Sequence, residues 1–303
     1  MRYGIVTANL GEYADPRVAV DLARTAEAAG WEAFFVWDHL GFVRGAPSGD
    51  PWIILSAIAA STEHLTLGLA VTPLARRRPQ VVANAMTSLD LLSGGRAIFG
   101  AGLGGVPEEF TAFGEPGDPK ERAAMLDEGL RILDGLWSGE TVAHRGRHYA
   151  VQGVSLAPRP LQRPRVPIWI GGEGPPAVRR AARWDGWLAP ATGNDGYPTM
   201  AKSPELIAEM VAEVRRHRTT PAPFDVAIDG YSEAGESELP RAYGAAEATW
   251  WLESIHDARP ARRDDDQGGC GPPGDAMRSS DAVRGCSDVR CPPGTGRRTR
   301  CVR

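Results

Sequence analysis

The body of this 303-residue chain contains no cysteine. All four cysteines fall near the end, at Cys270, Cys286, Cys291 and Cys301. A disulfide-stabilised fold needs cysteines within its body, so this distribution excludes such a framework for residues 1–269. Lysine is also scarce: Lys120 and Lys202 are the only two, and neither lies at the end of an expected strand, where an aldolase would carry its Schiff-base lysine.

Long apolar runs are missing too. No segment approaches the ~20 apolar residues that a membrane helix needs, and the N-terminal MRYGIVTANL lacks the apolar core of a signal peptide. The net charge of −4 is unfavourable for binding nucleic-acid phosphates, and the histidines show no metal-site spacing such as H-E-x-x-H. We therefore expect a cytoplasmic protein with a small-molecule substrate and no metal, nucleic-acid or membrane partner.

Short, nearly continuous apolar segments recur along the chain. Eight of them have the composition of strands: 3–9, 33–38, 65–71, 96–101, 167–171, 186–190, 225–230 and 248–253. Strands that are apolar on both faces are typical of a parallel sheet covered on both sides.

Helix signals lie between these segments. An N-capping side chain stands directly before a proline at Asp15-Pro16, Asp50-Pro51, Asp118-Pro119 and Ser203-Pro204. A proline at the first helical position loses no hydrogen bond, so these pairs are typical helix starts. A core-facing stripe at helical spacing follows the third pair, at Leu126, Leu130, Leu133 and Trp137.

Repeated strand–helix alternation leaves two α/β architectures, a closed barrel or an open doubly wound sheet. Eight strands, and no G-x-G-x-x-G turn after the first one, favour a (β/α)8 TIM barrel. Residues 140–166 interrupt the alternation and read as a β-hairpin with a proline-rich connector before the fifth strand.

The sequence changes character after residue 256. Ile255 is the last isoleucine, leucine, phenylalanine, tyrosine or tryptophan, and no glutamate or lysine follows it. Such a segment buries too little apolar surface to offset the entropy of ordering it. We predict a barrel domain at 1–256 and an aberrant, disordered low-complexity tail at 257–303. Our hypothesis for the tail is a shifted reading frame in GC-rich coding DNA, with an ordinary charged tail as the alternative.

Several fragments carry a family resemblance: VWDHL, LGLAVTPLARRRP, RAIFGAGLGGVPEEFTAFG, APRPLQRPRVPIWIGGEGPPAVRRAARWDGWLAP and ATWWLESI. In this order they resemble the luciferase-like monooxygenase superfamily, whose members use FMN or the deazaflavin F420. The resemblance implies a TIM-barrel oxidoreductase that acts on a small organic substrate by hydride transfer or oxygen incorporation. It also implies a possible homodimer.

Asp38 and His39 lie at the C-terminal end of the second expected strand, at the barrel end where active sites form. An imidazole titrates near pH ~6.5 and exchanges protons readily. The resemblance implies that His39 is the catalytic proton donor and that Asp38 contacts the polar edge of the cofactor ring. From the residues alone, a helix-capping aspartate beside an exposed histidine is the alternative.

The resemblance also places the cofactor against three strand ends. Ala70, Val71 and Thr72 match the place where relatives commonly have a non-prolyl cis peptide behind the ring, although an ordinary strand end before a proline turn is the alternative. Two sets of glycines border the cofactor and its phosphate: Gly102, Gly104 and Gly105 after the fourth strand, and Gly171, Gly172 and Gly174 after the fifth. Glycines let a backbone approach a ligand closely, and a helix N-terminus attracts anions, but both sets are also compatible with ordinary turns.

One position departs from the pattern of the F420-dependent sugar-phosphate dehydrogenases. They have a catalytic glutamate in the loop after the fourth strand, where this chain has Gly105. We therefore expect no sugar-phosphate oxidation by that mechanism, unless the loop brings Glu108 or Glu109 into that place. A non-catalytic flavin-binding protein, or an inactive member without its last helix, is the alternative function.

Overall fold

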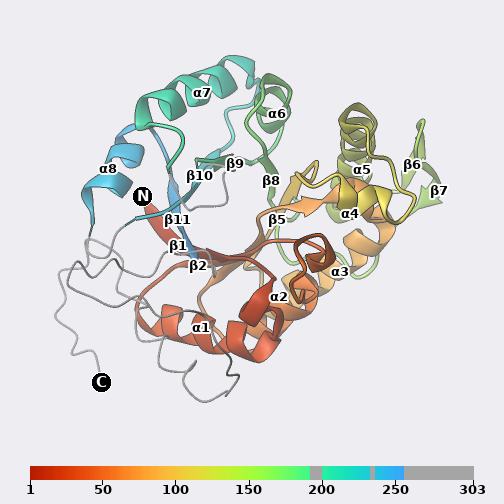
Figure 1. Cartoon of the computed structure of the whole chain (residues 1–303). Coiled ribbons are helices and arrows are strands. Elements are labelled where there is room, and N and C mark those ends of the chain that lie inside the picture. Colours follow the sequence, from red (N-terminus) through yellow and green to blue (C-terminus); the bar gives the residue numbers. More distant parts are fainter. Residues whose placement is uncertain (192–199, 233–235, 256–303) are drawn as a thin grey trace.

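The computed structural model describes residues 1–191, 200–232 and 236–255 (Figure 1). The predicted tail at 257–303 lies outside the described residues. The eight strands of the main ring are β1 (Arg2–Thr7), β2 (Ala33–Val36), β3 (Thr66–Leu69), β5 (Ala97–Gly102), β8 (Ile168–Gly171), β9 (Gly186–Pro190), β10 (Asp225–Gly230) and β11 (Trp250–Ile255). Each lies within, or within two residues of, a strand predicted from the sequence.

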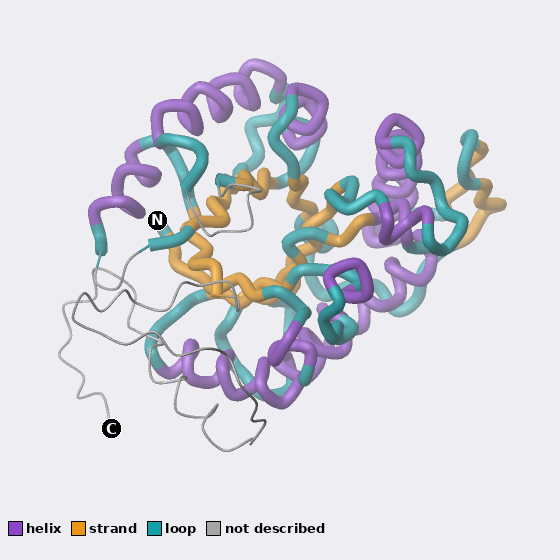
Figure 2. Tube along the Cα trace, in the orientation of Figure 1, coloured by secondary structure: helices purple, strands orange, loops and turns teal. Residues whose placement is uncertain are grey.

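These strands form one closed parallel ring. The order of hydrogen-bonded neighbours is β3-β2-β1-β11-β10-β9-β8-β5, and a further pairing of β3 with β5 closes it. Figure 2 shows the ring surrounded by helices. The predicted (β/α)8 TIM barrel is confirmed, and the open doubly wound sheet is excluded.

Seven ring strands are followed by an outer helix within the described residues. These helices are α1 (Pro16–Ala28), α2 (Pro51–Ala59), α3 (Pro79–Ser93), α5 (Pro119–Ser138), α6 (Pro175–Ala181), α7 (Pro204–His217) and α8 (Glu238–Ala245). Asp15, Asp50, Asp118 and Ser203 all accept a backbone N–H at the starts predicted for them. The predicted stripe of α5 is fully buried. None of these helices has the length and apolarity to cross a membrane, within the part of the chain that is described.

The predicted hairpin is present as β6 (Val142–Arg145) and β7 (Ala150–Val154), which pair antiparallel. Smaller elements that the sequence did not reveal are β4 (Thr72–Pro73), α4 (Glu108–Thr111) and three 3₁₀ turns, η1 (Gly11–Ala14), η2 (Gly41–Arg44) and η3 (Leu74–Arg76). Two of these, η3 and α4, turn out to carry residues of the candidate site.

Two apolar layers fill the molecule. The larger layer packs the helices on the outer face of the ring, while a smaller cluster that includes Val6, Phe35, Trp169 and Trp250 fills the interior. Because all ring strands run parallel, their C-terminal ends meet at one rim. That rim is the place where the predicted site residues come together.

Candidate functional site

We use "barrel mouth" for the segments at the C-terminal rim that were predicted to bind the cofactor or substrate: Asp38–His39, Ala70–Thr72, Gly102–Gly105 and Gly171–Gly174. They follow or end β2, β3, β5 and β8. In the ring, β2, β3, β5 and β8 are consecutive neighbours. The four predicted segments therefore lie on one side of the same rim.

His39 is held in place by two other segments. The side-chain amide of Asn9 donates to the His39 carbonyl at 2.9 Å, and its oxygen accepts the His39 N–H at 3.0 Å. The ring nitrogen Nδ1 lies 2.7 Å from Oε1 of Glu109, on α4. An ionised carboxylate only accepts, so Nδ1 carries the hydrogen and Nε2 is left to exchange a proton.

Asp38 lies directly before this histidine and is almost fully buried, with 2% exposure. Arg77 donates to both of its carboxylate oxygens at 2.8 Å, and Arg76 donates to Oδ1 at 2.8 Å. Arg76 also pairs with Oε2 of Glu109. Asp38, Arg76, Glu109 and His39 therefore form one charged network that orients the imidazole.

The charge state of Glu109 follows from this network. Burial disfavours its charged form, but the hydrogen bond from His39 and the positive charges of His39 and Arg76 outweigh that effect. The pKa of Glu109 consequently lies below its ordinary value. The carboxylate therefore stays ionised at neutral pH and places a negative charge beside the imidazole.

The Ala70–Val71 peptide bond is cis, as expected from the family resemblance. The Val71 side chain lies between two strand ends that have no side chain of their own. A Cβ at Gly102 would collide with Cγ2 of Val71, and a Cβ at Gly171 would lie 2.6 Å from Cγ1. Glycine at these two positions therefore makes room for Val71, which the sequence did not indicate.

The remaining glycines are placed differently. Gly104 has a φ of +79°, and a Cβ there would lie 2.9 Å from Phe110, whereas a Cβ at Gly105 would meet nothing within 4 Å. Gly172 has a φ of +124° and accepts a hydrogen bond from Nε1 of Trp187 at 2.7 Å. Gly174 is the N-cap residue of α6. Their predicted contact with a cofactor and its phosphate stays a prediction.

The mouth suits a flat ligand with a polar edge. Ala70 and Val71 are partly exposed and present a small apolar surface, flanked by glycine backbone at Gly102 and Gly171. A Cβ at Gly105 would meet nothing within 4 Å, so the loop after β5 is open at this residue. Thr72 lies behind it, fully buried, and its hydroxyl has no hydrogen-bond partner among the described residues. The residues present fit a flavin or deazaflavin ring.

Sequence reasoning found Asp38 and His39 but missed their partners. Nothing in the sequence indicates that Arg76 and Arg77 pair with Asp38, and the sequence offers Glu109 only as a replacement for the loop glutamate. The loop does bring Glu109 back to the mouth, because α4 starts at Glu108 and turns the next side chain inward. Within the described ranges, no three metal-ligating side chains lie close enough to bind an ion.

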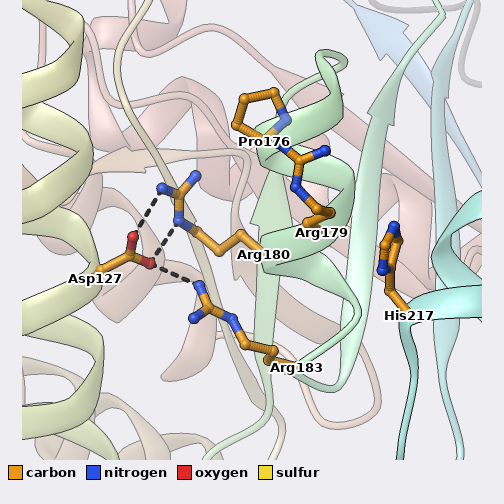
Figure 3. A pocket seen from close by; sticks show the side chains of 6 residues that line it. All are labelled: Asp127, Pro176, Arg179, Arg180, Arg183 and His217. Atoms are coloured by element: carbon orange, nitrogen blue, oxygen red, sulfur yellow. Dashed lines mark hydrogen bonds and ion pairs between the residues drawn. The ribbon is translucent and has the colours of Figure 1, made fainter.

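A separate hollow of about 440 Å³ lies on the outer side of the barrel (Figure 3). Asp127 of α5 accepts from Arg180 at 2.8 and 3.1 Å and from Arg183 at 2.9 Å. Arg180 is almost completely buried, and the hollow is also lined by Arg179 and His217. These ion pairs join α5 to the α6 segment, so we interpret this hollow as structural.

Comparison with known proteins identifies the family of this chain. A family model described as luciferase-like monooxygenase matches residues 1–281. The chain belongs to the luciferase-like monooxygenase family. The matched range runs past the domain boundary predicted at residue 256, which stays a prediction.

Curated relatives include an F420-dependent glucose-6-phosphate dehydrogenase from Microbacterium testaceum, 34% identical over 218 residues. That match covers 69% of this chain and 60% of the relative, so the chain spans less than two thirds of the relative's length. Another, from Beutenbergia cavernae, is 38% identical over 180 residues, covering 57% of this chain and 52% of the relative.

Solved structures share the fold. A monooxygenase from Streptomyces bottropensis superposes with a TM-score of 0.63 at 26% identity, covering 82% of this chain and 77% of that one. An F420-dependent secondary alcohol dehydrogenase in complex with an F420-acetone adduct gives a TM-score of 0.71 at 17% identity, covering 86% and 94%. The second likeness shows the barrel fold alone.

Proposed function

We propose that this protein is an oxidoreductase that binds F420 or FMN at the barrel mouth and transfers a hydride to or from a small organic substrate. The observation that carries the proposal is the 2.7 Å contact between His39 Nδ1 and Glu109 Oε1, next to the Val71 surface, in a member of this family. It provides an oriented proton donor beside a surface that fits a planar ring.

F420 is the first choice of cofactor because the curated relatives named above are F420-dependent. FMN is the second choice, because the family resemblance implies either cofactor and because the family description and the Streptomyces protein are of monooxygenases. The bound cofactor supplies hydride acceptance and donation, and FMN can also support oxygen incorporation. F420 is restricted in practice to hydride transfer because carbon replaces the ring's N5.

The chain's own residues have three tasks in this proposal. Val71 supports one face of the ring, and the glycine strand ends admit its polar edge and its phosphate. His39 holds a proton at Nε2 for the ring, while Glu109 and Asn9 keep the imidazole oriented. Asp38 reaches the ring edge only while also bound to Arg76 and Arg77, so we assign it mainly to positioning these arginines.

We propose a neutral or anionic substrate that carries a hydroxyl or carbonyl group. The two relatives named above are glucose-6-phosphate dehydrogenases. The family resemblance, however, puts Gly105 where their catalytic glutamate is expected. Glu109 is the carboxylate that this chain brings to the mouth instead. Glucose 6-phosphate should therefore be tested as a substrate, and we expect little or no turnover of it.

The test begins with absorbance and fluorescence titration of the purified full-length protein with F420 and with FMN. Turnover is then followed by F420 absorbance with secondary alcohols, cyclic alcohols and glucose 6-phosphate. We expect F420 binding, and turnover that falls at least 100-fold in His39→Ala. Binding without turnover of any substrate would favour the non-catalytic flavin-binding alternative, and failure to bind either cofactor would overturn the proposal.

We extend the proposal to a cytoplasmic homodimer. Four large apolar side chains are exposed on adjacent helices: Ile53 (61%) of α2 and Val81 (61%), Leu91 (38%) and Leu92 (50%) of α3. Because α2 and α3 pack against each other, a second copy can cover both. Light scattering after gel filtration should give a molar mass twice that of the chain. The Val81→Glu variant should have the mass of a single chain.

A further inference from the structure

Asp229 is an acidic residue of the barrel interior that has no part in the proposed function. It is the next-to-last residue of β10, and its Cα pairs with Pro190 of β9 and Leu252 of β11. Side chains alternate along a strand, so Asp229 faces the same side as Ala227, which belongs to the interior cluster. Its carboxyl group therefore points into the barrel near the rim.

The position of β10 in the ring places this acid away from the strand ends that Val71 covers. In the ring order, three strands lie between β3 and β10 on either side. Val71 follows β3, but its side chain extends over the ends of β5 and β8, and β9 separates β8 from β10. Asp229 thus lies on the side of the mouth that the cofactor surface leaves to the substrate.

The carboxyl group is incompletely paired. It is hydrogen-bonded to the side chain of Ser254 on β11, while Oδ1 has no partner among the described residues. Oδ1 itself is buried, whereas the residue as a whole keeps some exposed surface. A buried polar atom without a partner calls for an explanation, and a bound ligand supplies one.

Two further facts bear on its protonation. Burial, together with the negative charge of Glu253 on β11, raises the pKa of Asp229 to about 7, and the Ser254 hydrogen bond opposes this only in part. Pro190, which faces it from β9, is uncharged. The environments of Asp229 and Glu109 thus shift their pKa values in opposite directions, as in sites where one carboxyl group exchanges protons and another stays ionised.

We propose that Asp229 is a substrate-contacting acid–base residue, which exchanges a proton with the hydroxyl or carbonyl oxygen of the substrate. When an alcohol is oxidised, Asp229 accepts the hydroxyl proton as the C–O bond becomes C=O, and the carbon-bound hydrogen leaves as a hydride to the oxidised cofactor. In the reverse direction the protonated carboxyl donates to the carbonyl oxygen. His39 serves the cofactor side of the mouth, so the two groups handle different protons.

The proposal rests on the proposed function, and two readouts separate them. The first is independent of turnover: the unfolding free energy of wild type and Asp229→Asn is compared from pH 5 to pH 8. Because the folded state raises the pKa, wild type should lose stability relative to the variant as pH rises through 7. Equal pH dependence in both proteins would overturn the proposal even if no cofactor or substrate were found.

The second readout is turnover with the best alcohol of the panel. Asp229→Asn should bind F420 as wild type does, lower kcat/KM about 100-fold and abolish the pH-dependent limb near 7. Asp225→Asn is the matched control, since Asp225 lies at the other end of the same strand and pairs with Arg2. An unchanged pH profile in an active Asp229→Asn would refute the role of Asp229 and leave the proposed function standing.

Discussion

At the scale of single residues, the chemistry depends on how Glu109 holds His39. Nδ1 of His39 is occupied by Glu109, and Oε2 of Glu109 is occupied by Arg76. Both carboxylate oxygens of Glu109 are thus occupied, one by the imidazole and one by a guanidinium. A change at Glu109 should therefore affect activity much more than stability.

The first prediction concerns Glu109→Gln. Glutamine cannot stabilise an imidazolium, and its amide can turn toward His39 and reverse the tautomer, so kcat should fall about 100-fold or more. Cofactor affinity should change little. Glu108→Gln is the control, because Glu108 precedes it and is exposed. Equal activity of the two variants in an F420 reduction assay would show that Glu109 has no role in activity.

The second prediction concerns the room that glycine leaves for Val71. Gly102→Ala should displace the Val71 side chain, destabilise the protein by about 1–3 kcal/mol and weaken cofactor binding. Gly105→Ala should be tolerated in a folding assay, since its new methyl group meets nothing within 4 Å. Denaturant unfolding and cofactor titration of both variants make the comparison, and a Gly102→Ala protein that behaves like wild type contradicts it.

At the scale of elements, one side chain ties the inserted hairpin to the barrel. Glu128 of α5 accepts the backbone N–H groups of Arg147 at 2.9 Å and Tyr149 at 3.1 Å, in the turn between β6 and β7. Nε2 of His144 lies 3.3 Å from the same carboxylate. The turn's amides are thus satisfied by a helix rather than by solvent.

The third prediction follows from this contact. Burial opposes the charge, but these hydrogen bonds prevail and lower the pKa of Glu128 to about 2. Since the folded state depresses the pKa, the stabilisation is present above pH ~4.5 and is lost as pH falls toward 2. Glu128→Gln should cost up to about 3 kcal/mol at pH 7 and much less near pH 2. Glu121→Gln, in the first turn of the same helix, should cost under ~1 kcal/mol.

At the scale of the whole molecule, the barrel closes within residues 1–255. β1 pairs with β11 over six residues, from Arg2 with Trp250 to Thr7 with Ile255. Closure therefore joins the start of the chain to the last described strand. The sequence after residue 255 contains no isoleucine, leucine, phenylalanine, tyrosine or tryptophan.

The fourth prediction tests the boundary at residue 256. A chain that ends there should have a Tm within a few degrees of the full-length protein and the same cofactor affinity, because the removed segment has little apolar surface to bury. Calorimetry of both chains measures this. A large loss of stability would place part of 257–281, which the family model also matches, in the fold. A restored family-like C-terminus that raises Tm would support the reading-frame hypothesis.

Much of the barrel could be predicted because its signals are local. Proline after a capping side chain marks a helix start wherever it occurs, and continuous apolar segments mark strands buried on both faces. The helix starts at Pro16, Pro51, Pro119 and Pro204 and the eight strands follow from such short stretches. Asp38 and His39 were found for a related reason, since a residue directly after a barrel strand must lie at the mouth.

The partners in the site depend on contacts between distant segments. His39 and Glu109 are 70 residues apart, and Asp38 and Arg77 are 39 apart. Their pairing follows from ring closure and from the turn at α4, neither of which leaves a local pattern. In the sequence, Asp229 is one residue of an expected strand, and only ring closure shows that its carboxyl group is buried at the rim. Local sequence thus specifies the helices, the strands and the barrel. The tertiary structure alone brings distant side chains close enough to shift one another's pKa values.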